Sequence, residues 1–258
     1  MGGALLEGLI ARGLDPRRVR VQDPAPPAEV AALLARHGIA AQPSIETSEA
    51  PGVIIAAVKP QVMDAVFPPV ARLAGPGALT ISIAAGRTLA SFEAHLPAGA
   101  AVVRAMPNTP AAIGRGITVC AANGHVTPAQ KQLCGELMAA VGEVAWVDDE
   151  AAMDAVTAVS GSGPAYVFLL AECLEKAAIA AGLAPDLAKR LARATVSGSG
   201  ELLHRSDAEA STLRQNVTSP GGTTAAALAV LMAKGEGLEE LLKKAVLAGE
   251  GRSRELAK

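Results

Sequence analysis

The chain has 258 residues, half of them apolar, with one Trp, one Tyr and three Phe and a net charge of −2 from 23 basic and 25 acidic side chains. This length is enough for one large domain or two ordinary ones, each with a hydrophobic core. Mixed charge and few rings argue against a nucleic-acid partner. The longest apolar stretches are strand-sized, so we also expect no membrane partner.

The chain opens directly as an amphipathic helix, and no strand precedes it. In a dinucleotide-binding fold, a first strand feeds a G-x-G-x-x-G turn, and an acidic residue about 20 positions later meets the ribose. Here Gly2 and Gly3 begin the helix, and Asp23 follows Gly3 by 20 residues, just after the strand-like residues 19–21. The spacing predicts a dinucleotide-binding fold that lacks its first strand and first two glycines. The alternative is a flexible start before an ordinary amphipathic helix.

Absence of that strand has an energetic consequence. A central strand buries about five side chains, and losing it removes about 10 kcal/mol, comparable with the net stability of a domain. We therefore expect either that Met1 is internal to the natural protein or that this form folds poorly. Sequencing the N-terminus of protein purified from its own cell checks the first option, which finding Met1 there would exclude.

Short β-branched runs alternate with helical patterns as far as residue 147. Helices are predicted over 27–37, after Pro60, and after Thr127, which is an N-cap followed by Pro128 at the first helical position. Strand–helix alternation predicts a parallel sheet covered on both faces. The predicted strands cover residues 19–21, 53–58, 79–83, 102–103, 117–121 and 144–147.

Beyond residue 148 the strand signal disappears, and Ala/Leu-rich helices follow. The sequence therefore predicts a dinucleotide-binding domain over 1–149 and an all-helical domain over 150–258. Segments 165–170 and 225–232 carry apolar residues on more than one helical face. One layer of helices cannot bury so much apolar surface, so a partner subunit is expected to cover it.

The strongest local motif is V-T-S-P-G-G-T-T at 217–224, followed at once by an apolar helix. Ser219 can cap the helix, Gly221 and Gly222 let the backbone turn its amides inward, and the helix adds its positive end. Each charge-assisted hydrogen bond contributes about 1.5–3 kcal/mol. The motif predicts a carboxylate or phosphate site. A plain loop with a capped helix is the alternative, and a P-loop is disfavoured because no Lys follows the glycines.

Three further segments carry candidate site residues. The run D-A-V-T-A-V-S-G-S-G-P-A-Y at 154–166 interrupts a helical pattern with two glycines and a proline, which indicates a kink that another group approaches closely. Segments 57–60 and 106–110 follow predicted strands, and ligands in open α/β sheets bind at the carboxyl ends of strands. Singly, each also fits an ordinary helix junction, a surface lysine or a turn.

Together these four segments, in this order and spacing, resemble pyrroline-5-carboxylate reductase, the last enzyme of proline biosynthesis. The runs at 154–166 and 217–228 resemble the two signature stretches of that family, and the match spans the whole chain. The resemblance implies a dinucleotide-binding domain followed by a helical dimerisation domain, and a homodimer or a larger ring of dimers. It also implies reduction of 1-pyrroline-5-carboxylate to proline by NADPH or NADH.

The resemblance also implies roles for individual residues. Thr224 is the implied catalytic residue, facing the ring nitrogen of a substrate whose carboxylate rests on the turn. The implied substrate-binding residues are Glu150, Ser219, Gly221, Gly222, Thr223 and Thr224. The implied cofactor contacts are Ala57, Val58, Lys59, Pro60, Ile83, Ala84, Ala85, Asn108, Thr109, Pro110, Ser160, Gly161, Ser162 and Gly163, with Asn216 as a further candidate and Gly2, Gly3 and Asp23 added by the spacing argument. The turn is expected from one subunit and the nucleotide domain from the other.

Two departures from the family pattern and two alternative functions remain. The first strand is missing, and the 204–211 loop is about one residue longer than the family pattern, so we assign no role to Asp207 or Glu209. Asp23 favours NADH on the ribose argument, whereas family members often prefer NADPH, so that choice stays open. A 3-hydroxyacid dehydrogenase would carry Lys followed four residues later by Asn, which Lys176 and Lys189 do not show. The other alternative is a non-catalytic helical dimer.

The cysteines and histidines indicate neither a disulfide framework nor a metal site. Cys120, Cys134 and Cys173 are scattered without C-x-x-C spacing, which fits a reducing, cytoplasmic compartment. The four histidines lie far apart without ligand spacing, so no metal is expected.

Overall fold

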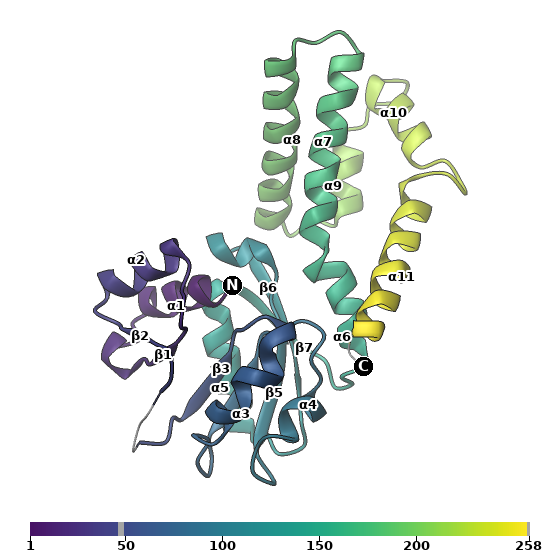
Figure 1. The fold of residues 1–258 in the computed structure, drawn as a ribbon. Coiled ribbons are helices and arrows are strands. Elements are labelled where there is room, and N and C mark those ends of the chain that lie inside the picture. Colours follow the sequence, from purple (N-terminus) through teal and green to yellow (C-terminus); the bar gives the residue numbers. More distant parts are fainter. Residues whose placement is uncertain (46–48, 257–258) are drawn as a thin grey trace. The chain divides into compact units, whose positions relative to one another are not determined.

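A computed structural model describes residues 1–45 and 49–256 (Figure 1). The chain divides into two compact units, of which the first comprises Met1–Gly161 with the C-terminal residues from Gly249, and the second comprises Ser162–Ala248.

The first unit alternates strands and helices. Its elements in chain order are α1 (Gly2–Ala11), η1 (Pro16–Arg18), β1 (Val21–Gln22), α2 (Ala28–Arg36), β2 (Ala41–Gln42), β3 (Val53–Ala56), η2 (Pro60–Val62), α3 (Met63–Ala71), β4 (Leu79–Ser82), α4 (Leu89–Glu93), β5 (Ala101–Met106), η3 (Thr109–Ile113), β6 (Gly116–Ala122), α5 (Pro128–Met138), η4 (Ala139–Val141), β7 (Gly142–Trp146), α6 (Ala152–Val156) and the π-helical turn η5 (Thr157–Gly161).

Most predicted elements are confirmed, and the exceptions have local causes. α5 begins as expected, because the Thr127 hydroxyl accepts a hydrogen bond from the backbone N–H of Gln130, and the Gln130 side-chain oxygen accepts one from the backbone N–H of Thr127. The predicted strand 53–58 ends at Ala56, where its partner β4 also ends. The prediction for β5 covered only residues 102–103, because the charged Arg104 interrupts the apolar pattern. The strand itself runs over Ala101–Met106. The two-residue strand β2 is too short to show a pattern.

The strands of the described residues form two sheets. β1 pairs in parallel with β2, and a second sheet has the order β3-β4-β5-β6-β7. A dinucleotide-binding order of 3-2-1-4-5 would place a further strand between β1 and β3, and no strand of the described chain occupies that interval. On either side of that interval, the described strands follow the order of a dinucleotide-binding sheet.

The prediction of a parallel sheet is confirmed for β3, β4 and β5, but it is wrong for β6, which runs antiparallel to β5. A parallel return needs a crossover of about a dozen residues or more, usually a helix. Residues 107–115 between β5 and β6 hold only the 3₁₀ turn η3, so the chain turns back beside the strand it has just left.

The core lies on both faces of the larger sheet, which confirms the predicted covering on two sides. Adjacent residues Val102 and Val103 of β5 belong to different apolar clusters, because successive side chains of a strand point to opposite faces. α1 and α5 contribute Leu5 and Met138 to the cluster with Val103. α3 and α4 cover the other face, where the rings of Phe67 and Phe92 meet edge to face at 4.9 Å.

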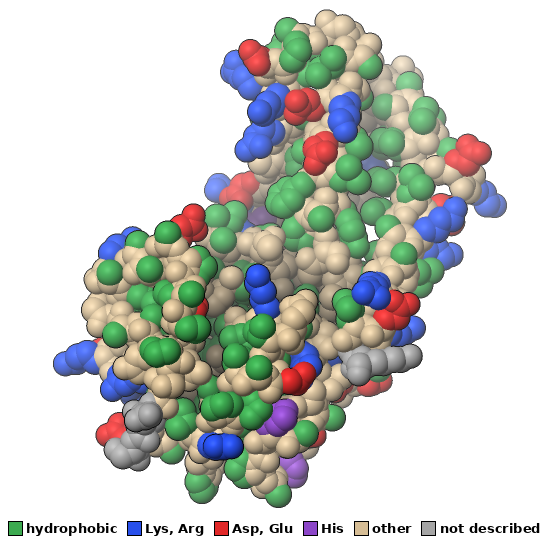
Figure 2. Space-filling view, in the orientation of Figure 1, with side chains coloured by type: hydrophobic (Ala, Val, Ile, Leu, Met, Phe, Trp, Pro, Cys, Tyr) green, Lys and Arg blue, Asp and Glu red, His purple; other side chains and the backbone are tan. Residues whose placement is uncertain are grey.

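The second unit is helical. It contains α7 (Gly163–Ala180), α8 (Pro185–Arg205), α9 (Ala210–Asn216), α10 (Thr223–Leu231) and the first turns of α11 (Leu238–Leu256), and α7 packs along α8. No residue of α7 or α10 is buried, and Phe168 and Val230 are 63% and 72% exposed. Figure 2 shows such apolar side chains on the helical unit. Apolar surface on this scale marks an association surface.

Among the residues that the structure describes, no helix combines the length and hydropathy of a membrane-spanning segment.

Candidate functional site

The candidate cofactor residues gather at one edge of the larger sheet. β3, β4 and β5 are parallel neighbours, so their carboxyl ends lie side by side. Three segments follow these ends, and they consist of Ala57, Val58, Lys59 and Pro60, of Ile83, Ala84 and Ala85, and of Asn108, Thr109 and Pro110. Segments far apart in the sequence therefore meet at the edge where open α/β sheets bind ligands.

Gly2 and Gly3 bring the first turn of α1 against this edge. A Cβ atom added to Gly2 would lie 3.0 Å from Ala57 Cβ, and one added to Gly3 would lie 2.9 Å from a methyl group of Val30 in α2. The first amides of α1 have no carbonyl partner within the helix, and Met1 caps none of them with its side chain. A tight, side-chain-free cradle with open amides fits the pyrophosphate of a dinucleotide.

Side chains tie the loops at the edge to the sheet. The Asn108 side-chain oxygen accepts a hydrogen bond of 3.0 Å from the Ile117 N–H, which links the end of β5 to β6. The buried Ser82 hydroxyl oxygen accepts one of 3.3 Å from the Ala84 N–H. Both loops are thereby pre-arranged, which lowers the entropy that a ligand must remove on binding.

The η5 turn contributes Ser160 and Gly161. Gly161 packs against the terminal methyl of Met106, so a Cβ there would collide with it. The Ser160 hydroxyl oxygen is buried and has no hydrogen-bond partner among the described residues. A buried polar atom normally finds a partner. An orphaned hydroxyl beside the end of β5 therefore fits a group that a bound cofactor would supply.

Asp23 is half-buried at the carboxyl end of β1. Its N–H donates to the Gln42 carbonyl at 2.9 Å, and its Oδ1 accepts from the Ala25 N–H at 3.0 Å. These bonds hold the carboxylate at the end of its strand, where an acidic side chain can receive ribose hydroxyls.

The second unit holds the turn of the strongest sequence motif. The Gly222 N–H closes it on the Ser219 carbonyl at 3.1 Å, and Gly221 has the positive φ of 70° that favours glycine. α10 begins at Thr223 without a side-chain cap. The first amides of the helix thus stay open for an anion, with Thr224 half-buried beside them. Ser162 and Gly163 begin α7, and Asn216 ends α9.

Arg104 is a buried charged residue that sequence analysis did not single out. It is 4% exposed in the middle of β5, and its Nη1 donates to Glu150 Oε1 at 3.1 Å. The available signal was a charged residue inside the apolar run A-V-V-R-A-M. Removing one partner of such a buried pair costs about 3–5 kcal/mol, because the remaining charge loses its counter-ion. The structure thus places Glu150 against β5.

Comparisons with known proteins agree with this geometry. Residues 150–256 match the family described as "Pyrroline-5-carboxylate reductase dimerisation", and residues 1–86 match "NADP oxidoreductase coenzyme F420-dependent". The pyrroline-5-carboxylate reductase of Pseudomonas aeruginosa is 42% identical over 259 residues, which cover 100% of this chain and 93% of that protein.

Two solved structures extend the similarity. A pyrroline-5-carboxylate reductase from Coxiella burnetii superposes with a TM-score of 0.90 at 36% identity, covering 99% of this chain and 94% of that one. The Plasmodium falciparum pyrroline carboxylate reductase, solved with NADP bound, gives 0.78 at 28% identity, with coverages of 100% and 95%. The predicted fold and dimerisation domain are confirmed, and nothing favours the hydroxyacid dehydrogenase or the non-catalytic alternative. The chain belongs to the pyrroline-5-carboxylate reductase family.

Proposed function

We propose that this protein reduces 1-pyrroline-5-carboxylate to proline, with NADPH or NADH as the reductant. The observation that carries the proposal is the pairing of two sites in one family member. One is the glycine cradle and loop cluster at the carboxyl edge of the first unit's sheet, and the other is the amide-lined turn before α10. A nucleotide-linked reductant and a small carboxylic acid are the two ligands that such sites suit.

The chain's own groups have defined roles in this proposal. When bound, the nicotinamide supplies the hydride that reduces the C=N carbon of the substrate. Ser219, Gly221, Gly222 and Thr223 bind the substrate carboxylate through backbone amides and hydroxyls. The ring nitrogen takes up one proton from water as the C=N bond becomes an amine, and the Thr224 hydroxyl, which hydrogen-bonds that nitrogen, assists this proton transfer. Alignment of donor and acceptor lowers the barrier by about 7–11 kcal/mol.

The cofactor would be held mainly by the first unit, with its pyrophosphate at Gly2 and Gly3 and its ribose hydroxyls at Asp23. The loop residues of the sheet edge would contact the rest, together with Ser160, Gly161, Ser162 and Gly163, and Asn216 is a further candidate. We propose that one subunit supplies the turn and its partner the nucleotide-binding domain. We further propose that residues 1–149 bind the cofactor, that residues 150–258 form the dimer and bind the substrate, and that dimers assemble into a ring. A cytoplasmic location is consistent with the three free cysteines.

The direct test is oxidation of NADPH or NADH by the purified protein in the presence of 1-pyrroline-5-carboxylate. The loss of reduced cofactor is monitored by its absorbance, and the product is identified as proline. We expect turnover that requires both substrates. A 3-hydroxyacid in place of the imine, with oxidised cofactor, serves as the control for the alternative enzyme class. Oxidation without proline formation, or no oxidation in folded protein that binds NADPH, would refute the proposal.

Asp23 should influence the choice between the two cofactors. Its carboxylate suits the ribose hydroxyls of NADH and repels the extra phosphate of NADPH, so Asp23→Ser should shift the ratio of the two dissociation constants about tenfold toward NADPH, equivalent to about 1.4 kcal/mol. Fluorescence titration of both cofactors measures this ratio. Glu143→Gln, which removes an exposed carboxylate from β7, is the control. An unchanged ratio would show that Asp23 does not contact the ribose.

A further inference from the structure

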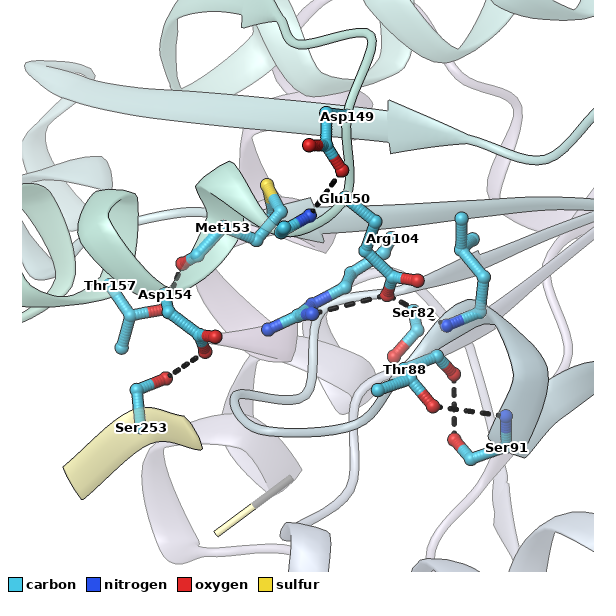
Figure 3. Close-up of polar contacts among 12 residues, drawn as sticks. Ser82, Thr88, Ser91, Arg104, Asp149, Glu150, Met153, Asp154, Thr157 and Ser253 are labelled. Carbon is cyan, nitrogen blue, oxygen red and sulfur yellow. Dashed lines mark hydrogen bonds and ion pairs between the residues drawn. The ribbon is translucent and has the colours of Figure 1, made fainter. Parts of the chain in front are cut away.

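One charged side chain in the sheet is buried where the proposed chemistry does not use it. Arg104 lies in the middle of β5 with 4% of its surface exposed. Its guanidinium donates to Glu150, whose side chain is 27% exposed in the segment after β7. Figure 3 shows the two side chains pointing toward one another, close to Ser82 and Thr88. A buried cation persists only where a specific partner compensates its lost hydration.

The same carboxylate oxygen has a second donor. Glu150 Oε1 also accepts a hydrogen bond of 2.8 Å from the backbone N–H of Leu89, the first residue of α4. A carboxylate at a helix N-terminus meets open amides and the positive end of the helix dipole. Glu150 thus joins three elements that are separate in the sequence, namely β5, α4 and the segment after β7.

These contacts fasten one loop at both ends. Residues 83–88 connect β4 to α4. At the beginning of the loop, the buried Ser82 hydroxyl accepts the Ala84 N–H, and Ser82 is the register partner of Arg104 on the neighbouring strand. At the end of the loop, Glu150 holds the Leu89 N–H. Between these anchors lie Ile83, Ala84 and Ala85, the loop's candidate cofactor contacts.

We propose that Glu150 and Arg104 are positioning residues for the cofactor: the two hydrogen bonds that Glu150 Oε1 accepts, from Arg104 and from the Leu89 N–H, hold the 83–88 loop in the conformation that receives the dinucleotide. The proposal rests on the proposed function insofar as the ligand of this loop is NAD(P)H. It assigns Glu150 a role different from the substrate contact implied by the family resemblance, because its Oε1 already serves two donors within the chain.

Three substitutions at one position separate geometry from charge. Gln keeps an acceptor at the same reach without the charge, whereas Asp keeps the charge but is one methylene shorter, and Ala removes both. We expect Glu150→Ala and Glu150→Asp to raise the dissociation constant of NADPH about tenfold, the equivalent of one hydrogen bond to a charged group. Glu150→Gln should stay within about threefold of the unsubstituted protein, since both hydrogen bonds can re-form.

The readout is the dissociation constant of NADPH, measured by fluorescence or calorimetry without the imine at a temperature where thermal unfolding shows each variant folded. If Glu150 had a purely structural role, its substitution would lower the melting temperature, but the NADPH dissociation constants would not separate Glu150→Gln from Glu150→Asp and Glu150→Ala. Glu136→Ala is the matched control, since Glu136 is an exposed carboxylate on α5 that, among the described residues, accepts a hydrogen bond from Gln132 of its own helix. If Glu150→Ala does not fold, the comparison of the NADPH dissociation constants of Glu150→Gln and Glu150→Asp tests the proposal.

Two results would overturn the proposal. One is an NADPH dissociation constant that stays the same in the Ala and Asp variants. The other is the reverse ranking, in which Glu150→Asp is closer to the unsubstituted protein than Glu150→Gln and only KM for 1-pyrroline-5-carboxylate changes. That result would make Glu150 a substrate contact. If the proposed function is wrong, the result is different: the unsubstituted protein binds NADPH but does not reduce the imine. The NADPH dissociation constants of the Glu150 variants still test the role of the loop in that case.

Discussion

Replacing Thr224 with Ala is expected to lower kcat for imine reduction about 100-fold, the lower end of the range for a side chain that assists proton transfer. Thr224 lies half-buried in the first turn of α10, directly after the turn that we propose for the substrate carboxylate. Without the hydroxyl, the developing amine has no partner at that position. The NADPH dissociation constant should not change, because Thr224 is not among the candidate cofactor residues, most of which lie in the first unit.

Steady-state kinetics with 1-pyrroline-5-carboxylate measure the effect, and Thr224→Ser should recover most of kcat because the hydroxyl returns. Thr212→Ala removes an exposed hydroxyl from α9 and is the matched control. If Thr224→Ala kept its turnover and substrate affinity, Thr224 would have no role in the reaction.

Gly222→Ala is expected to raise KM for 1-pyrroline-5-carboxylate about 10- to 100-fold, equivalent to one charge-assisted hydrogen bond of about 1.5–3 kcal/mol. An added Cβ would collide with the Ser219 hydroxyl and lie 3.2 Å from the Ser219 carbonyl oxygen. The turn closes through the Gly222 N–H and that same carbonyl, so it must open to make room. The amides would then no longer converge on one anion.

Substrate titration at saturating NADPH measures this KM. Gly124→Ala is the matched control, because nothing lies within 4 Å of a Cβ built there and its φ is not in the positive range that disfavours side chains. An unaltered KM in Gly222→Ala would place the carboxylate elsewhere and remove the basis for the anion-binding role of the turn.

Only the local parts of the cofactor edge were accessible to prediction. The loops containing Lys59 and Asn108 were singled out because each follows an apolar, β-branched run, and that pattern is local. The antiparallel course of β6 was not predicted, since strand direction depends on the length of a connection whose 3₁₀ turn has no strong signal. Arg104 and Glu150 are 46 residues apart, and no periodicity links such positions.

The sequence by itself determined the alternation of strands and helices, the two signature motifs and the family they indicate. These follow from side-chain patterns and turn chemistry within short windows, which act before any long-range contact forms. Tertiary structure alone decided that Gly2 abuts Ala57, that Arg104 is buried with Glu150 as its partner, and that Glu150 also holds the start of α4. Such pairings arise because sheet packing removes these groups from water, and each buried polar atom must then find its partner wherever the fold brings one close.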